Sequence, residues 1–344
     1  MRLTIAIPTF NRIEFLKRCL RSLASQINRL PRESQQEIDL YVSDNFSSDG
    51  TIEFLLDFQN EFESLRLNFG EKNQGPDWNI ANCYDKALGD YVLVLGDDDL
   101  LIDGAIEWIL NTTSKNDYGL LFLKAYSGEY FIAPPPSLLS RDLVVDSDNS
   151  ILTLSDRLTF ISSLVLKKNC FIQASRYLGT HLPQTYVSME VFNKIDKHIL
   201  SGKYFVFATR NNGGVVIDGV KTPPPPFGEV FILNIFNAFE RYQNYLSIKK
   251  SLARKIFFYY FLYEISRRNE EGAVLSKTKG ACDQIMGSEL SYKFLRPLMF
   301  SQLKIVRHHV LQVLSLVLRV FRGEFLKFLN YWWQTRLFSQ TPRR

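Results

Sequence analysis

Short apolar runs alternate with amphipathic stretches through the first 110 residues, and this alternation constrains the fold more than any other feature of the chain. Leu3–Ile7 and Tyr91–Leu95 have the length and composition of buried strands. Ile13–Ser25 carries apolar residues at helical spacing. The same criteria predict strands at Asp39–Val42 and Leu65–Phe69, and helices at Thr51–Phe58, Asp77–Leu88 and Ala105–Leu110. This order predicts right-handed βαβ units, and therefore an α/β fold with a mostly parallel central sheet.

Polar segments follow three of these predicted strands, namely Pro8–Arg12, Ser43–Gly50 and Gly96–Asp99. Parallel sheets bind ligands beyond the carboxyl ends of their strands. We therefore expect the three segments to converge on one edge of the sheet and to form the functional site there.

Three adjacent carboxylates, Asp97, Asp98 and Asp99, come directly after the most apolar strand. They repel one another, so they need a cation or a well-hydrated setting. Their hard oxygen ligands suit Mg²⁺ or Mn²⁺, which typically share their ligand shell with a substrate diphosphate. A solvated acidic turn is the alternative, but the position after a buried strand favours metal and nucleotide binding.

A second motif surrounds Asp44, which stands at the end of another predicted strand. Its carboxylate can accept hydrogen bonds from a base or a ribose. Ser48 or Asp49 can cap the helix that follows, and Gly50 relaxes the turn. By itself the motif is equally compatible with an ordinary capped loop.

Together these motifs resemble the family 2 glycosyltransferases, and more narrowly the abequosyltransferase-like branch of bacterial O-antigen assembly. The matching segments, over about residues 1–110, are Ile5–Arg12, Ser43–Thr51, Asn73-x-Gly75, Ala87–Tyr91 and Gly96–Asp99. The chain departs from the family pattern at Asn45, where the family usually has a second Asp, and at Gly96, which replaces the first acid of the acidic motif.

The resemblance implies a Rossmann-like glycosyltransferase-A fold, a nucleotide-diphospho-sugar donor, a lipid-linked saccharide acceptor and Mg²⁺ or Mn²⁺. By position, Pro8, Thr9 and Asn11 would line the nucleoside pocket, and Asp44 would contact the base. Asp98 and Asp99 align with the last two acidic positions, near ribose and metal, and Asp97 falls on the variable one. The metal pair is therefore Asp97 with Asp99 or Asp98 with Asp99.

The resemblance also implies inversion at the anomeric carbon, with an Asp or Glu as general base. Glu190 lies about 90 residues past the acidic motif, where such a base is usual, although Val191 replaces the second acid of the usual pair. An exposed helix glutamate is the alternative, and Asp218 and Asp196 are the other candidates for the base. His181 could contact sugar or phosphate, but a lone His is more often structural.

Two other classes of protein share part of this pattern. Asp97-x-Asp99 after a strand also occurs in haloacid-dehalogenase-type phosphatases, but Leu100 follows where that class usually has Thr or Val. No later strand ends in the Gly-Asp-Gly-x-x-Asp of that class. A non-catalytic nucleotide-sugar-binding module would be expected to have a damaged acidic cluster, and this one is intact.

The last third of the chain has a different composition. Four consecutive prolines at 223–226 suggest a catalytic domain over 1–225 and a helical C-terminal region over 226–344. Residues 296–344 hold nine Lys or Arg and one acid, against a formal net charge of +5 for the whole chain. Within them, Val310–Gln334 predicts a helix with a wide apolar face, a narrow cationic face and Trp332 and Trp333 near its end.

This composition predicts a tail that associates with a membrane surface, with a packed helix as the alternative. The remainder of the chain is mildly acidic, which does not indicate a nucleic-acid partner. Four scattered cysteines fit a reducing compartment, and neither a signal peptide nor an apolar stretch of 18 residues is recognised. We therefore expect a cytoplasmic protein at the inner face of the cell membrane.

Overall fold

The computed structural model describes residues 3–62, 64–128, 134, 141–209, 216–217, 220–221, 233–256 and 272–286. The chain divides into two units. The first comprises residues 1–225 and 234–246, and the second comprises residues 226–233 and 247–344. The predicted boundary at the four prolines and the predicted tail over 310–344 both lie outside the described residues.

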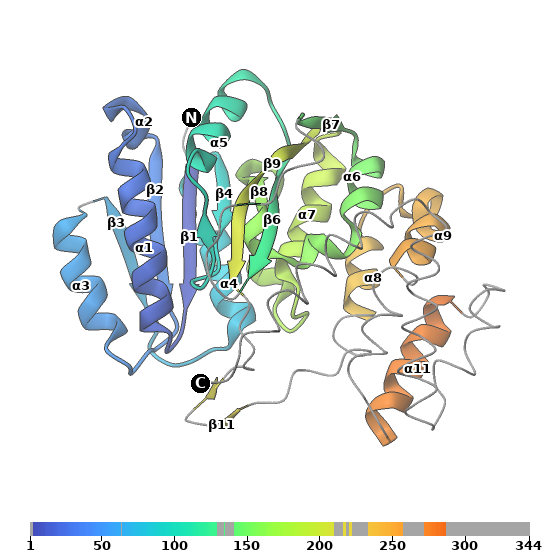
Figure 1. Cartoon of the computed structure of the whole chain (residues 1–344). Coiled ribbons are helices and arrows are strands. Elements are labelled where there is room, and N and C mark those ends of the chain that lie inside the picture. The colour runs from blue at the N-terminus through green and yellow to red at the C-terminus, as the bar shows by residue number, and fades with distance from the viewer. Residues whose placement is uncertain are drawn as a thin grey trace, which may run out of the picture. The chain divides into compact units, whose positions relative to one another are not determined.

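A mixed sheet forms the centre of the first unit (Figure 1). Its described strands run in the order β3 (Leu65–Phe69), β2 (Ile38–Asp44), β1 (Leu3–Thr9), β4 (Tyr91–Val94), β8 (Leu164–Lys167), β6 (Leu120–Gly128), β9 (His198–Thr209) and β5 (Leu100–Leu101), and β7 (Leu143–Val145) also pairs with β9. The half from β3 to β4 is entirely parallel, as the alternation predicts. In the other half β8 is antiparallel to both neighbours, while β6 and β9 are parallel.

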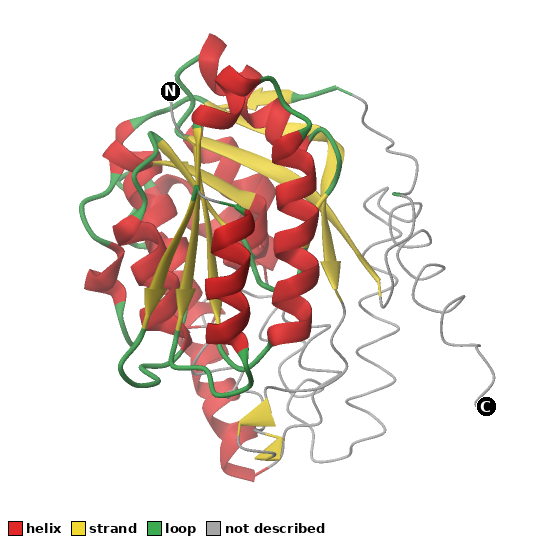
Figure 2. Cartoon of the chain, turned by 90° about the vertical axis from the view of Figure 1, so that its left-hand side faces the viewer, coloured by secondary structure: helices red, strands yellow, loops and turns green. Residues whose placement is uncertain are grey.

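Helices flank this sheet on both faces, as the side view shows (Figure 2). They are α1 (Ile13–Asn28), α2 (Arg32–Gln36), α3 (Thr51–Glu61), α4 (Pro76–Lys86), α5 (Ala105–Lys115), α6 (Ser147–Leu154), α7 (Pro183–Lys194) and α8 (Asn234–Phe239). Short 3-10 helices η1 (Ser155–Thr159), η2 (Ile161–Ser163), η3 (Lys168–Cys170) and η4 (Ala174–Tyr177) join β8 to its neighbours in the chain. A small hairpin of β10 (Val216–Ile217) and β11 (Val220–Lys221) completes the elements described in this unit.

Alternation along β1 explains why both faces of the sheet are covered. Ile5 and Ile7 point into one apolar core with Leu16 and Leu20 of α1, and all four are fully buried. The residues between them face the other side of the sheet, where α4 packs on β1, β2 and β4. Burial of apolar area on both faces fixes the carboxyl ends of β1, β2 and β4 relative to one another, which a binding site at that edge requires.

The second unit is described only in part. Helix α9 (Tyr245–Ile256) begins at the end of the first unit, and α11 (Gly272–Met286) follows it, in agreement with the predicted helical region. Cys19, Cys83, Cys170 and Cys282 are all buried free thiols. In the part of the chain that the structure describes, no helix is long and apolar enough to cross a membrane.

Candidate active site

The three polar segments predicted to converge do meet, at the carboxyl edge of the parallel half of the sheet. Thr9, the last residue of β1, pairs in register with Asp44 of β2, and its carbonyl accepts the amide of Asn45 at 3.0 Å. The Asn11 amide donates to Ser47 Oγ at 2.8 Å, and Asn11 Oδ1 accepts the Ser48 amide at 2.8 Å. Asn11 has a φ of 50°, in the left-handed region that Asn tolerates, so the chain turns sharply here.

Asp49 joins the first amides of two helices at this edge. One carboxylate oxygen accepts the Ile13 amide at the start of α1, and the other accepts the Thr51 amide and hydroxyl at the start of α3. Gly50, with a φ of 89°, is the N-cap residue of α3, so Asp49 contacts the helix from one position further out than a capping side chain would. The negative carboxylate also suits the positive ends of both helices.

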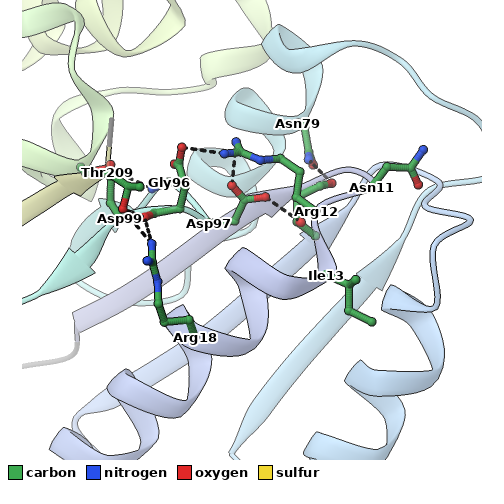
Figure 3. A network of polar contacts seen from close by, with 12 residues as sticks. Asn11, Arg12, Ile13, Arg18, Asn79, Gly96, Asp97, Asp99 and Thr209 are labelled. Atoms are coloured by element: carbon green, nitrogen blue, oxygen red, sulfur yellow. Dashed lines mark hydrogen bonds and ion pairs between the residues drawn. The ribbon is translucent and has the colours of Figure 1, made fainter. Parts of the chain in front are cut away.

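The three aspartates follow β4 in a tight loop, and side chains from distant parts of the chain hold this loop, as Figure 3 shows for Asp97 and Asp99. Asp97 accepts the Thr9 hydroxyl at 2.8 Å and pairs with Arg12 at 2.9 Å. Asp98 pairs with the other terminal nitrogen of Arg12 at 2.6 Å. Asp99 accepts the Ser162 hydroxyl at 2.5 Å and the Thr209 amide at 3.2 Å. The loop is thereby tied to the ends of β1 and β9 and to η2.

Burial dominates the electrostatics of this loop. Asp97 is only 3% exposed and Asp99 only 5%. Burial raises the pKa of Asp97 to about 7 against the opposing effect of Arg12, and burial together with the charge of Asp98 raises the pKa of Asp99 to about 7. Both carboxylates are therefore undercompensated in the absence of a bound cation.

A glycine explains how the loop brings the carboxylates so close to the backbone. A Cβ at Gly96 would lie 3.1 Å from a carboxylate oxygen of Asp98 and 3.1 Å from one of Asp99. A side chain at this position would crowd both groups, which gives a physical reason for Gly where the family pattern has an acid.

The carboxylates of this loop fit a divalent cation whose remaining ligands come from a bound substrate. Among the described residues, no group of three or more His, Cys, Asp or Glu side chains is placed to hold a metal ion. Mg²⁺, however, is commonly bound by only one or two carboxylates together with substrate phosphates. Asp97 and Asp99 supply two buried carboxylates with raised pKa values, so of the two predicted pairs the burial favours this one.

Two buried oxygen atoms at the same edge are left without partners by the described part of the chain. Asp44 is fully buried, and its Oδ2 accepts the Ser47 amide at 3.0 Å while its Oδ1 has no hydrogen-bond partner there. Asn79, in the first turn of α4, donates to the Thr9 carbonyl at 3.1 Å, and its Oδ1 is likewise unpartnered. An unsatisfied buried acceptor is costly, so each atom fits a donor group on a bound ligand.

The other predicted residues form no described hydrogen bond with the three aspartates. Glu190, on α7, accepts the Tyr177 hydroxyl at 2.5 Å, and no described hydrogen bond or ion pair joins it to the aspartate loop. Asp196 accepts the Ser147 amide at 2.8 Å, and the His181 amide donates to Asp77 at 2.7 Å. Asp218 lies outside the described residues. Pro8 belongs to β1 beside Thr9.

Sequence reasoning assigned no role to several residues of the network. Arg12 belongs to the segment Pro8–Arg12, which was predicted to converge with the three aspartates. A positive charge in that segment was the sequence signal for its pairing with them. Arg18 donates to the Asp98 carbonyl and to the Thr209 hydroxyl, each at 2.7 Å. No sequence signal could have linked Thr209 or Ser162 to the aspartates, because they are 110 and 63 residues from Asp99.

Residues 4–154 match the model of glycosyl transferase family 2. A curated relative, the abequosyltransferase RfbV of Salmonella typhimurium, is 30% identical over 212 residues, which are 56% of this chain and 62% of the relative. The GalNAc(5)-diNAcBac-PP-undecaprenol beta-1,3-glucosyltransferase of Campylobacter jejuni is 29% identical over 33% of this chain and 35% of that protein. The chain thus spans less than two thirds of the length of either relative. The predicted resemblance to the family 2 glycosyltransferases, and to an abequosyltransferase among them, is confirmed.

Solved structures show the same fold. S. aureus TarS residues 1–349, solved with UDP-GlcNAc, superposes with a TM-score of 0.65 at 18% identity, covering 94% of this chain and 92% of that one. The mannosyltransferase PcManGT of Pyrobaculum calidifontis, solved with GDP-Man and Mn²⁺, superposes with a TM-score of 0.51 at 12% identity, covering 93% and 87%. At these identities the likeness establishes the glycosyltransferase-A-like fold alone, as predicted.

Proposed function

We propose that this protein transfers a sugar from a nucleotide-diphospho-sugar donor to a lipid-linked saccharide in bacterial surface-polysaccharide assembly, with inversion at the anomeric carbon. One observation carries the proposal. In a family 2 domain, two buried, undercompensated carboxylates and the unpartnered oxygen of Asp44 lie at a single sheet edge. The names of two relatives support this acceptor class. The name of one includes a saccharide linked to PP-undecaprenol, and the other relative is named as an abequosyltransferase.

The donor would lie across the carboxyl ends of β1, β2 and β4. Pro8, Thr9 and Asn11 would line the nucleoside pocket, and Asp44 would accept a hydrogen bond from the base through its free Oδ1. Asp98, the most exposed of the three aspartates, would contact the ribose. Thr9 would link the two halves of the site, because its hydroxyl is already bonded to Asp97.

Asp97 and Asp99 would hold Mg²⁺ or Mn²⁺, which neutralises charge as it develops on the diphosphate leaving group. The Arg12 guanidinium reaches Asp97 and Asp98 at 2.9 and 2.6 Å, so this chain also places its own cation beside the diphosphate position. A planar guanidinium suits phosphate oxygens as well as carboxylates. Glu190 would remove the proton from the acceptor hydroxyl.

A screen of nucleotide sugars for Mn²⁺-dependent thermal stabilisation tests the proposal. Ligands that bind only the folded state raise its melting temperature by mass action. We expect at least one nucleotide sugar to stabilise the protein with Mn²⁺ and much less without it. Stabilisation by none of the common uridine, guanosine, cytidine and thymidine diphospho-sugars would contradict donor binding.

The metal-dependent stabilisation should increase with pH. A carboxylate must lose its proton to bind a metal, so with pKa values of about 7 the apparent affinity should fall roughly tenfold to a hundredfold between pH 8 and pH 6. Without metal, the contribution of these two carboxylates to folding stability changes with pH in the opposite direction. Raised carboxylate pKa values mean that the folded state holds more protons below pH 7, so these groups favour folding as the pH falls.

Melting temperatures at pH 6 and pH 8, with nucleotide alone and with nucleotide plus Mn²⁺, measure both effects. Asp103→Asn is the matched control, because Asp103 is exposed and pairs with Arg29 outside the site. A metal-dependent shift that is equal at the two pH values in the wild type would exclude Asp97 and Asp99 as its ligands.

We further propose that residues 1–225 form the catalytic domain and that the helical region over 226–344 carries a tail that places the protein at the cytoplasmic face of the cell membrane. The basic and apolar composition of residues 310–344 supports this proposal. Flotation with anionic vesicles should recover the full chain at low salt but not a chain ending at residue 309. Equal flotation of both chains would refute the role of the tail.

A further inference from the structure

A cavity of about 450 Å³ lies beside α4, and none of the three aspartates lines it. One wall is formed by residues of α4, namely Trp78, Asn82, Asp85 and Lys86. The chain between η3 and η4 contributes Ile172 and Gln173 to the opposite wall. The volume falls within the roughly 300–1,000 Å³ that small-molecule sites occupy.

Helical spacing explains how α4 builds this groove. Asp77 and Asp85 lie eight residues apart on one stripe of the helix, and both anchor the facing chain. Asp85 accepts the amides of Ala174 and Ser175 at 2.6 and 3.2 Å. Asp77 accepts the amides of Gly179 and His181 at 3.1 and 2.7 Å. Because Asp85 holds Ala174 and Ser175, which directly follow Gln173, the wall formed by Ile172 and Gln173 is fixed to α4 at its C-terminal end.

The side chains on the neighbouring stripe of α4 give the groove its chemistry. Trp78, Asn82 and Lys86 follow one another at intervals of four residues, so they line the same side of the helix. The Trp78 indole and Ile172, which is 70% exposed, offer apolar surface to solvent. Gln173 offers an amide group, and Asn82 offers its amide oxygen, because the Asn82 nitrogen already donates to Tyr41 and Ser43 at 3.0 and 2.8 Å. The adjacent charges of Asp85 and Lys86 cancel.

Apolar surface with amide groups and no net charge suits a neutral saccharide. A pyranose ring has apolar C–H faces that pack on an indole, and hydroxyl groups that bond to amides and carboxylates. An anionic ligand such as a phosphate would require an excess of positive charge, which the residues that line this groove do not supply.

The residues of α4 that line the groove start one position before Asn79, which belongs to the candidate active site. Asn79, which follows Trp78, donates to the Thr9 carbonyl, and the Thr9 hydroxyl donates to Asp97. From Trp78 the lining residues extend eight positions along α4 to Lys86, or about 12 Å at helical rise. We propose that this groove binds the part of the saccharide acceptor remote from the reacting hydroxyl. The inference rests on the proposed transferase function and adds a separate acceptor subsite to it.

A microarray of neutral bacterial surface glycans, probed with the full chain, tests the subsite. We expect the wild type to be captured by a subset of glycans, and Trp78→Ala to reduce that capture at least tenfold. Gln173→Trp is the second variant, because it fills the groove from the exposed side and leaves the packing of α4 intact. Leu88→Ala is the control, since Leu88 is exposed just beyond α4 and does not line the groove.

Mn²⁺-dependent stabilisation by the nucleotide sugar is measured on the same proteins. It should be unchanged in both groove variants, which separates loss of the subsite from loss of the fold or of donor binding. Capture of both variants as strongly as the wild type would overturn the proposal, and so would donor binding by a wild type that captures no glycan. If the wild type binds neither donor nor glycan, the proposed transferase function itself fails.

Discussion

We expect Asp99→Ala to lower sugar transfer at least about a thousandfold and to abolish metal-dependent donor binding, because it removes a charged group that stabilises the leaving diphosphate through the cation. Asp99 is almost fully buried, and it joins the loop after β4 to Ser162 and Thr209. The burial that raises its pKa to about 7 also makes its charge unfavourable to folding at pH 8. Loss of this charge should offset part of the cost of the lost hydrogen bonds, so the variant should stay folded.

Turnover with saturating Mn²⁺, together with the urea-unfolding midpoint, measures both effects. Asp103→Ala, an exposed aspartate four residues along the chain, is the matched control and should retain wild-type turnover. An Asp99→Ala protein with turnover within tenfold of the wild type would rule out Asp99 as a metal ligand. An unfolded variant would show instead that Asp99 stabilises the fold.

Glu190→Gln should lower turnover about a hundredfold with little change in donor affinity, as expected for loss of a general base. Glutamine keeps the shape of the side chain and can still accept the Tyr177 hydroxyl, so the contact at 2.5 Å does not have to break. Burial, reinforced by Glu190, raises the pKa of Tyr177 to about 12, so Tyr177 remains a hydrogen-bond donor throughout the working pH range.

Tyr177→Phe separates catalysis from positioning. It removes the hydrogen bond and leaves the carboxylate, so for a base at Glu190 its effect on turnover should be much smaller than that of Glu190→Gln. Equal, modest losses in the two variants would mean that the pair only holds α7 against η4. Asp196→Asn and Asp218→Asn would then be the next variants, with turnover and donor affinity measured in the same way.

The parallel half of the sheet was predictable because each of its strands is followed by a helix. In the sequence, this order is visible as short apolar runs that alternate with stretches of apolar residues at helical spacing. The convergence of the segments after Ile7, Val42 and Leu95 then followed from sheet geometry. The position of Asp97–Asp99 was predictable for the same reason, since three adjacent acids at the end of a buried strand are unfavourable without a ligand.

The mixed half of the sheet, which contains β8, β6 and β9, could not be predicted, because its strand order depends on contacts between residues far apart in the sequence. Strand β8 lies antiparallel between β4 and β6, although 35 residues of chain (129–163) separate it from β6. His198 is fully buried and accepts the amide of Leu120 through Nδ1 at 3.1 Å, and burial lowers its pKa to about 4. Such a neutral buried histidine is set by tertiary packing. The roles of Arg18, Ser162 and Thr209 were hidden by the same distance along the chain.

The most direct test of the central claim is sugar transfer itself. The purified full chain is incubated with Mn²⁺, a stabilising nucleotide sugar and lipid-linked saccharides extracted from bacterial membranes, and the lipid fraction is analysed by mass spectrometry. We predict that one saccharide species gains the mass of one sugar residue as an equal amount of nucleoside diphosphate is released, and that Asp99→Ala produces neither. A protein that binds the donor with Mn²⁺ but releases no nucleoside diphosphate with any acceptor fraction would be a non-catalytic binding module, and that result would contradict the account.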